Sequence, residues 1–129
     1  MSDVLVRAAD GTARMDTHEV AAFLLSRLGR TLTAYIAGSK SRAMPARWAA
    51  PPSDPAHAVP SDDKAGRLRA AHAVFRSIED AENDQVARSW LISANPRLGG
   101  VTPAELVRED KFPAVYSAVE AFLTDTYHA

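Results

Sequence analysis

Residues that start or end helices recur at short intervals along this chain, and this pattern most limits what it can fold into. Between them, apolar residues are spaced three or four positions apart, as in Val20, Phe23, Leu24 and Leu28. That spacing is typical of a helix that buries one face. The alternation typical of a strand extends no further than residues 4–6. The sequence therefore predicts an all-α fold.

Two helices separated by a tight turn are predicted in the first third of the chain. Asp16 and Glu19 have the spacing of a capping box, which starts the first helix. Gly29 suits the left-handed residue that ends it. Thr31 then starts a short helix over residues 32–37. This order of elements has the shape of a helix-turn-helix.

The segments on either side of these two helices carry weaker signals. Residues 1–15 contain Gly11 and show no clear period, so we expect a loose tail. Gly38 ends the second helix, and Pro45 starts a short helical segment that holds Trp48.

A proline-rich segment separates this region from the rest of the chain. Residues 50–63 contain four prolines and two serines, a composition that favours a semi-rigid linker with locally extended backbone. We therefore predict three parts. They are a helix-turn-helix-like region over residues 1–49, the linker over 50–63, and a small helical domain over 64–129.

Start and stop signals divide the last part into several helices. Each start has a capping residue or a proline, and each stop has a glycine or a proline. The residues concerned are Ser61, Asn83, Pro96, Gly99, Gly100, Thr102, Pro103 and Phe112. We expect a long helix after Ser61, a second after Asn83, a short one after Thr102 and a last one from Phe112.

The sequence gives no support for catalysis, for a cofactor or for a bound metal. No two of the four histidines have the spacing of metal ligands: His18, His57, His72 and His128. The chain has no cysteine, no phosphate-binding glycine loop and no nucleophile motif. We expect His72 to be a half-buried helix residue, and we expect no enzyme activity.

Charge is unevenly distributed although the formal net charge is −1. Residues 20–53 contain five basic residues and no acidic one, whereas the segment from Val101 onward is acidic. The asymmetry indicates two kinds of partner, and solvated helix faces are the alternative explanation. The apolar runs are too short to cross a bilayer and no secretory signal is visible. We therefore expect a cytoplasmic protein.

The basic segment and the helix-turn-helix shape together predict contact with DNA. In such a motif the second helix enters the major groove and flanking cations contact phosphates. The candidate DNA-binding residues are Arg30, Thr31, Thr33, Tyr35, Lys40, Arg42 and Arg47. A helical hairpin that serves only dimerisation is the alternative.

Residues 90–107, WLISANPRLGGVTPAELV, are the most specific segment. They predict a helix, an Asn-Pro stop, a Leu-Gly turn and a capped helix, and each of these parts also has a purely structural explanation. The combination of Trp90, Asn95-Pro96, Leu98-Gly99, Thr102-Pro103 and the last helix resembles the C-terminal toxin-binding domain of Xre/MbcA/ParS-type antitoxins, over residues 68–124. The N-terminal region resembles a divergent form of that family's helix-turn-helix.

The resemblance implies an antitoxin of a type II toxin–antitoxin module that forms homodimers. The implied partner is a RES-domain toxin that depletes NAD, and the antitoxin would cover its active-site entrance. It would also repress its own operon by binding promoter DNA. The candidate toxin-binding residues are Trp90, Asn95, Pro96, Arg97, Leu98, Gly99, Gly100, Thr102, Tyr127 and His128.

Two of these residues carry more detailed expectations. We expect Trp90 to be largely buried between the long helix and the last helix. Tyr127 would anchor a C-terminal tail in the toxin's pocket, and a frayed end is the alternative. Two other functions remain open: a helix-turn-helix transcriptional regulator without a toxin, and a helical adaptor.

Overall fold

The computed structural model describes residues 2–128, and the side chains of residues 2–125. In this part of the chain all regular structure is helical, which confirms the predicted all-α class. The elements in chain order are α1 (Asp3–Ala13), α2 (Thr17–Ala37), α3 (Met44–Ala49), α4 (Asp62–Ala81), α5 (Asp84–Ile92), the 3₁₀ turn η1 (Pro96–Leu98), α6 (Pro103–Arg108) and α7 (Phe112–His128).

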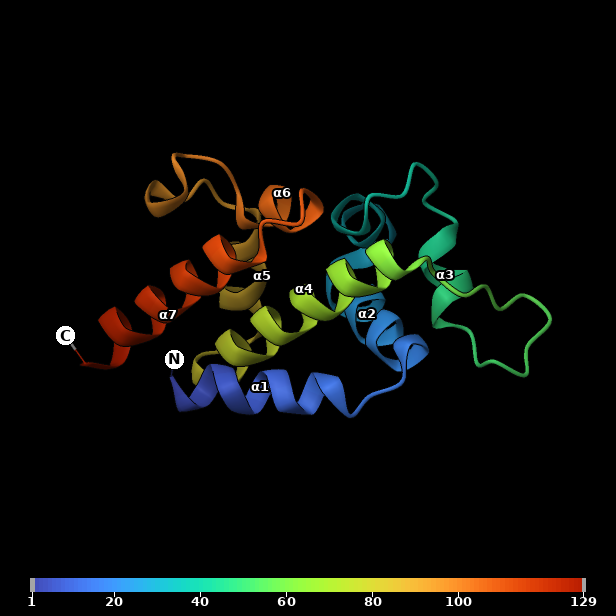
Figure 1. Cartoon of the computed structure of the whole chain (residues 1–129), viewed down its shortest axis with the longest axis horizontal. Helices are drawn as coiled ribbons and strands as arrows, with labels where there is room; N and C mark the ends of the chain where they lie inside the picture. Colours follow the sequence, from blue (N-terminus) through green and yellow to red (C-terminus); the bar gives the residue numbers. More distant parts are fainter. Residues whose placement is uncertain (1, 129) are drawn as a thin grey trace.

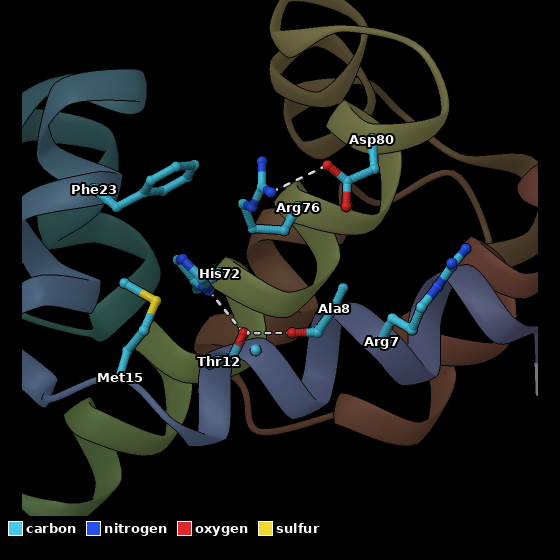
Figure 2. A pocket seen from close by; sticks show the side chains of 9 residues that line it. Arg7, Ala8, Thr12, Met15, Phe23, His72, Arg76 and Asp80 are labelled. Atoms are coloured by element: carbon cyan, nitrogen blue, oxygen red, sulfur yellow. Dashed lines mark hydrogen bonds and ion pairs between the residues drawn. The ribbon is translucent and has the colours of Figure 1, made fainter.

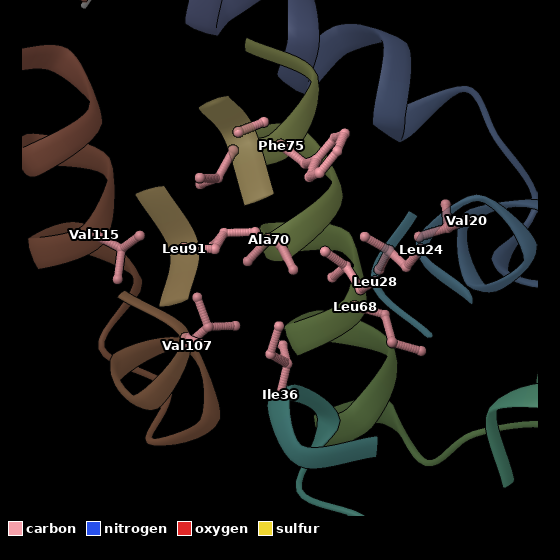
Figure 3. Close-up of a cluster of buried hydrophobic side chains, with 14 of the residues drawn as sticks. Val20, Leu24, Leu28, Ile36, Leu68, Ala70, Phe75, Leu91, Val107 and Val115 are labelled. Atoms are coloured by element: carbon pink, nitrogen blue, oxygen red, sulfur yellow. The ribbon is translucent and has the colours of Figure 1, made fainter. Parts of the chain in front are cut away.

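Helix α4 runs through the middle of the molecule, and the other long helices pack on it (Figure 1). Helices α1 and α2 contact one side of α4, while α5, α6 and α7 contact the other (Figure 3). One hydrophobic cluster includes residues from both sides, such as Leu24 of α2, Leu68 of α4 and Leu91 of α5. The core is therefore continuous across the predicted linker, and the division into domains stays a prediction.

Helix α1 occupies the segment that we expected to be a loose tail, so that expectation is wrong. Leu5, Ala8 and Thr12 are buried on its inner face, which packs against α4. The hydroxyl of Ser2 accepts a hydrogen bond from the backbone N–H of Leu5 at 3.2 Å and caps the helix. The period was hard to detect because alanine and threonine carry a weak apolar signal, and because Gly11 lies within the helix.

The two helices expected around Gly29 form the single element α2, which is kinked at that residue. Gly29 has φ of 83° and ψ of 172°, a conformation that glycine adopts without strain. The helix resumes directly after it, so the kink takes the place of the expected turn. The capping contact at the start is confirmed, since the Glu19 carboxylate accepts from the Asp16 N–H at 3.0 Å.

Two loops protrude at opposite ends of the molecule (Figure 1). Residues 50–61 extend beyond α3, and their base is fixed by a 3.0 Å hydrogen bond from the Ala58 N–H to the Arg47 carbonyl. Residues 93–102 extend above α7 and include η1. None of the described helices is long and apolar enough to cross a membrane.

Candidate functional site

The loop of residues 93–102 takes its shape from Asn95. The backbone N–H of Asn95 donates to the Val101 carbonyl at 3.0 Å, and its own carbonyl accepts from the N–H groups of Leu98 and Gly100, both at 2.9 Å. Its side-chain oxygen accepts from the Arg97 N–H, also at 2.9 Å. These four bonds close the loop on itself, so Asn95 fixes how its neighbours are presented.

Thr102 ends this loop and starts α6. Its hydroxyl accepts from the Glu105 N–H at 3.1 Å, and Pro103 occupies the first turn of the helix, as the sequence predicted. Gly99 and Gly100 form the turn before it. Thr102, Gly99 and Gly100 therefore set the geometry of the loop.

A surface groove lies between α5, the loop and α7, and we call it the α5–α7 groove. One end is a hollow of about 270 Å³ lined by Trp90, Asn95, Pro96, Arg97, Ala118, Phe122 and Asp125. The other end is a hollow of about 400 Å³ lined by Gln85, Val86, Ser89, Trp90, Ser93 and Phe122. Trp90 and Phe122 line both ends, with ring centroids 6.3 Å apart.

Trp90 is half-buried and packs against the hydrophobic cluster, so the expectation that its ring is largely buried stays a prediction. On α5 the residues that point into the core are Ala87 and Leu91, which are both fully buried. Trp90 follows Ala87 by three positions and lies at the edge of that face, where its ring packs against Phe122 of α7. The exposed part of the ring forms a wall of the groove.

Charged groups lie at the α7 end of the groove. Arg97 and Asp125 approach to 3.8 Å, and their side chains remain 62 % and 70 % exposed. An exposed pair at this distance contributes little to stability. Both groups are therefore accessible to a partner.

Residues 70–124 match the family model of the antitoxin Xre/MbcA/ParS C-terminal toxin-binding domain. The match confirms the resemblance seen in the sequence and supports an antitoxin role. Searches of curated proteins and of solved structures found no match to the chain. Loop 93–102 and every residue lining the groove except Asp125 lie within the matched residues 70–124.

The structure brings together four of the residues predicted to bind the toxin: Trp90, Asn95, Pro96 and Arg97. Leu98 is half-buried in η1, and the side chains of Tyr127 and His128 lie outside the described residues. The sequence analysis did not identify Phe122 as a site residue. Phe122 lies at the edge of the apolar face of α7, beside the buried Leu123, so its helical spacing predicts a core residue and not a wall of the groove.

The candidate DNA-binding residues lie in several different environments. Thr33 is fully buried, so it cannot contact DNA in this structure. Tyr35 is 38 % exposed, although the guanidinium of Arg108 lies 4.8 Å from its ring centroid and donates to the Tyr35 carbonyl at 2.6 Å. Arg47 is exposed as well and donates to the Ala56 carbonyl at 3.1 Å. The other four are also exposed: Arg30, Thr31, Lys40 and Arg42.

His72 lies away from the α5–α7 groove, on the side of α4 that faces α1 and α2 (Figure 2). It is only 3 % exposed, so it is more deeply buried than expected. Burial lowers the pKa of its imidazole to about 4, and the nearby charges of Arg76 and Arg69 act in the same direction. The described residues contain no group of three or more side chains that suits a metal ion.

Proposed function

We propose that this chain is the cytoplasmic antitoxin for a RES-domain toxin that depletes NAD. It would cover the toxin's active-site entrance with loop 93–102, the α5–α7 groove and the C-terminal end of α7. The observation that carries the proposal is the groove, where Trp90, Asn95 and Arg97 converge within the toxin-binding domain. Aromatic and arginine side chains in a hollow are typical anchors of protein interfaces.

The shape of the loop favours tight binding. Asn95 closes the loop through its own hydrogen bonds, so less conformational entropy is lost when a partner binds. Trp90 and Phe122 supply apolar area that is only half-buried in the free protein. Arg97 would leave Asp125 and pair with an acidic group of the toxin.

The test is co-expression of the chain with the RES-domain toxin encoded beside it. We expect a stable complex and a normal NAD level in cells that make both proteins. The variant Arg97→Glu should weaken the complex at least about tenfold, which corresponds to about 1.4 kcal/mol. Arg88→Glu is the matched control, because Arg88 is exposed on α5 and does not line the groove.

Two results would contradict this proposal. Equal loss of binding in both arginine variants would show that the groove is not the contact surface. An unchanged NAD level in cells that make the toxin alone would exclude the NAD-depleting type even if a complex forms. The purified chain should not consume NAD itself.

The role of the chain's last residues can be tested separately. We propose that the tail containing Tyr127 and His128 enters the toxin's pocket, with Tyr127 as its anchor. Deletion of residues 126–129 should then weaken neutralisation while leaving the groove intact. Full protection by the shortened chain would show that the tail contributes nothing.

We also propose that a dimer of this chain represses its own operon. The support is the exposure of Arg30, Lys40 and Arg42 in a segment that contains no acidic residue. Promoter binding should weaken steeply with salt, because cations released from DNA drive the association. Lys40→Ala and Arg42→Ala should each reduce the salt slope by about one. Absence of binding at low salt would exclude this role, and promoter binding without any toxin partner would favour a stand-alone regulator.

A further inference from the structure

We propose that the cavity between α1, α2 and α4 binds a small organic anion that also carries a hydroxyl or N–H donor. The cavity measures about 720 Å³, and Figure 2 shows most of its walls. This volume falls in the range of small-molecule sites. Its lining residues are Arg7, Ala8, Gly11, Thr12, Met15, Phe23, His72, Arg76 and Asp80. It lies on the opposite side of α4 from the α5–α7 groove and does not depend on toxin binding.

We infer from the two contacts of the Thr12 hydroxyl which nitrogen of His72 carries the proton. The Thr12 hydroxyl lies 3.0 Å from the Ala8 carbonyl and 2.7 Å from Nδ1 of His72. A hydroxyl has one hydrogen, and the carbonyl can only accept it. Both contacts are satisfied when Thr12 donates to Ala8 and the imidazole donates from Nδ1. His72 is then neutral, with a free lone pair on Nε2.

Nε2 of His72 is buried and has no hydrogen-bond partner among the described residues. A buried acceptor without a donor costs about 1–3 kcal/mol. A ligand hydroxyl or N–H would remove that cost, and this defines the donor that the ligand must carry. The neighbouring side chains of Met15 and Phe23 are only half-buried, so a small shift of either one would open the path to Nε2.

The charge around the cavity favours an anion. Arg76 pairs with Glu79 and, at 3.1 Å, with Asp80, and the second partner of Glu79 is Arg27. Arg7 lines the cavity from α1 and has no ion-pair partner among the described residues. These groups together carry one excess positive charge, and His72 is neutral. Arg7 is therefore the cation available to a carboxylate or phosphate.

The ligand would contact both walls of the cavity, since Arg7 and Thr12 belong to α1 and His72 and Arg76 belong to α4. Its binding would hold α1 against α4. A ligand that binds only the folded state raises the melting temperature in proportion to the logarithm of its concentration. The cavity therefore gives the antitoxin a means of responding to a metabolite.

The experiment uses the full chain and three probes that each combine an anion with a donor: citrate, glucose 6-phosphate and adenosine monophosphate. We expect at least one to shift the NMR signals of the His72 side chain and to raise the melting temperature at about 10 mM, where a site with a Kd of about 1 mM is nearly saturated. Uncharged glucose is the control and should have no effect. If none of the three probes shifts the His72 signals, the proposal is wrong.

Two variants test the assigned contacts. His72→Phe keeps the ring and removes the acceptor, and Arg7→Gln removes the free cation. Each should weaken binding of the active probe about tenfold or more, whereas the control Arg88→Gln, on the far side of the molecule, should not. Unchanged affinity in a folded His72→Phe variant would overturn the role of Nε2. Detection of the free protein's imidazole proton on Nε2 would overturn it as well.

Discussion

The two sides of α4 differ in what they bury. Towards α1 and α2 the interior includes the polar residues Thr12, Thr33 and His72, and two of their polar atoms have no partner in the described structure. Towards α5, α6 and α7 the fully buried residues include Leu91, Val107 and Val115 (Figure 3), and one buried oxygen of the half-buried Glu120 on α7 also has no partner in the described structure. The interface of α4 with α1 and α2 is therefore the more polar of the two.

The two interfaces of α4 also differ in what they form: the one with α5, α6 and α7 supports the α5–α7 groove, and the one with α1 and α2 contains the cavity. An apolar interface is stabilised in proportion to the area it removes from water, and on it α4 supports the helices that form the α5–α7 groove. Unpartnered buried polar groups reduce stability. A protein that retains them loses stability at that interface, which is the pattern expected where a ligand supplies the missing partner.

The largest loss of stability is expected when α1 and α2, which form the polar interface with α4, are deleted. A fragment of residues 62–129 lacks α1 and α2 and uncovers Phe75, whose ring lies 5.6 Å from that of Phe23. We expect the fragment to lose about 3 kcal/mol or more of its unfolding free energy. Denaturation followed by circular dichroism measures this. A fragment as stable as the full chain would instead support an independent domain after the linker.

The apolar side can be tested within one helix. Leu91 is fully buried and its neighbour Trp90 is half-buried. Leu91→Ala should cost about 3 kcal/mol because it leaves a cavity. Trp90→Ala should cost about 1–2 kcal/mol, because part of the ring is already in water. Thermal denaturation of the two variants shows which one loses more stability. A larger loss for Trp90→Ala would place that ring in the core.

On the polar side, His72 makes stability depend on pH. Its pKa is about 4 in the folded protein and 6.5 for the unperturbed group, so between these values the unfolded chain binds the extra proton. Stability should therefore fall as the pH decreases from 6.5 to 4, and this contribution should level off below 4. Each pKa unit is worth about 1.4 kcal/mol, so the loss of unfolding free energy between pH 6.5 and 4 should be about 3 kcal/mol.

The comparison with His72→Phe isolates this contribution. Arg69, Arg76 and Glu79 of α4, together with Arg7 and Asp80 on the cavity walls, remain in both proteins. The difference in unfolding free energy between wild type and variant should vary over pH 4–6.5 and be flat above it. A constant difference over this range would show that the imidazole has the same pKa in the folded and the unfolded protein.

Local signals in the sequence predicted the part of the chain from α4 onward better than the N-terminal part. The predicted caps at Ser61 and Thr102 depend on short-range hydrogen bonds, and both are present. The predicted break near Asn83 is also present, and the Asn83 side chain caps the helix that follows. Asn95-Pro96 likewise shapes its own loop. A capping residue and its partner lie within three positions of each other, so the sequence alone contains the information.

The features that the sequence missed depend on contacts between distant segments. Helix α1 packs on α4, and Thr33, in the part of α2 after the kink, is fully buried by the elements packed around that helix. The α5–α7 groove exists because Phe122 reaches Trp90 from 32 positions away in the chain. The spacing of apolar residues along a sequence does not show which distant side chains meet. The family resemblance nevertheless pointed to the segment that contains both residues.

Arg67 links the elements on the two sides of α4, and a substitution beside it should have a smaller effect on stability. It donates to the Ala37 carbonyl of α2 at 3.0 Å and to both carboxylate oxygens of Asp110 at 2.9 and 3.0 Å. A Cβ at Gly38 would lie 2.5 Å from its Nη1, and Gly38 has φ of 81°. Gly38→Ala should cost about 1–2 kcal/mol from backbone strain and displacement of the guanidinium.

A double-mutant cycle separates these two causes. In an Arg67→Ala background only the backbone strain remains, so Gly38→Ala should cost about 1 kcal/mol there. Chemical denaturation of the wild type, the two single variants and the double variant gives the coupling free energy between Gly38→Ala and Arg67→Ala. Equal costs in both backgrounds would show that the guanidinium moves aside freely and does not link α2 to the segment after α6.

The smallest effect is expected at Thr33, and it should be stabilising. The Thr33 side chain is fully buried and its hydroxyl has no partner in the described structure. Thr33→Val replaces that hydroxyl with a methyl of similar size, so the variant removes an unsatisfied group without opening a cavity. We expect a gain of about 1 kcal/mol, measured as a higher melting temperature. DNA binding should be unaffected, because a buried side chain cannot contact a phosphate or a base. A loss of stability would show that the hydroxyl has a bound water or another partner, and the polar side of α4 would then contain one unsatisfied atom fewer.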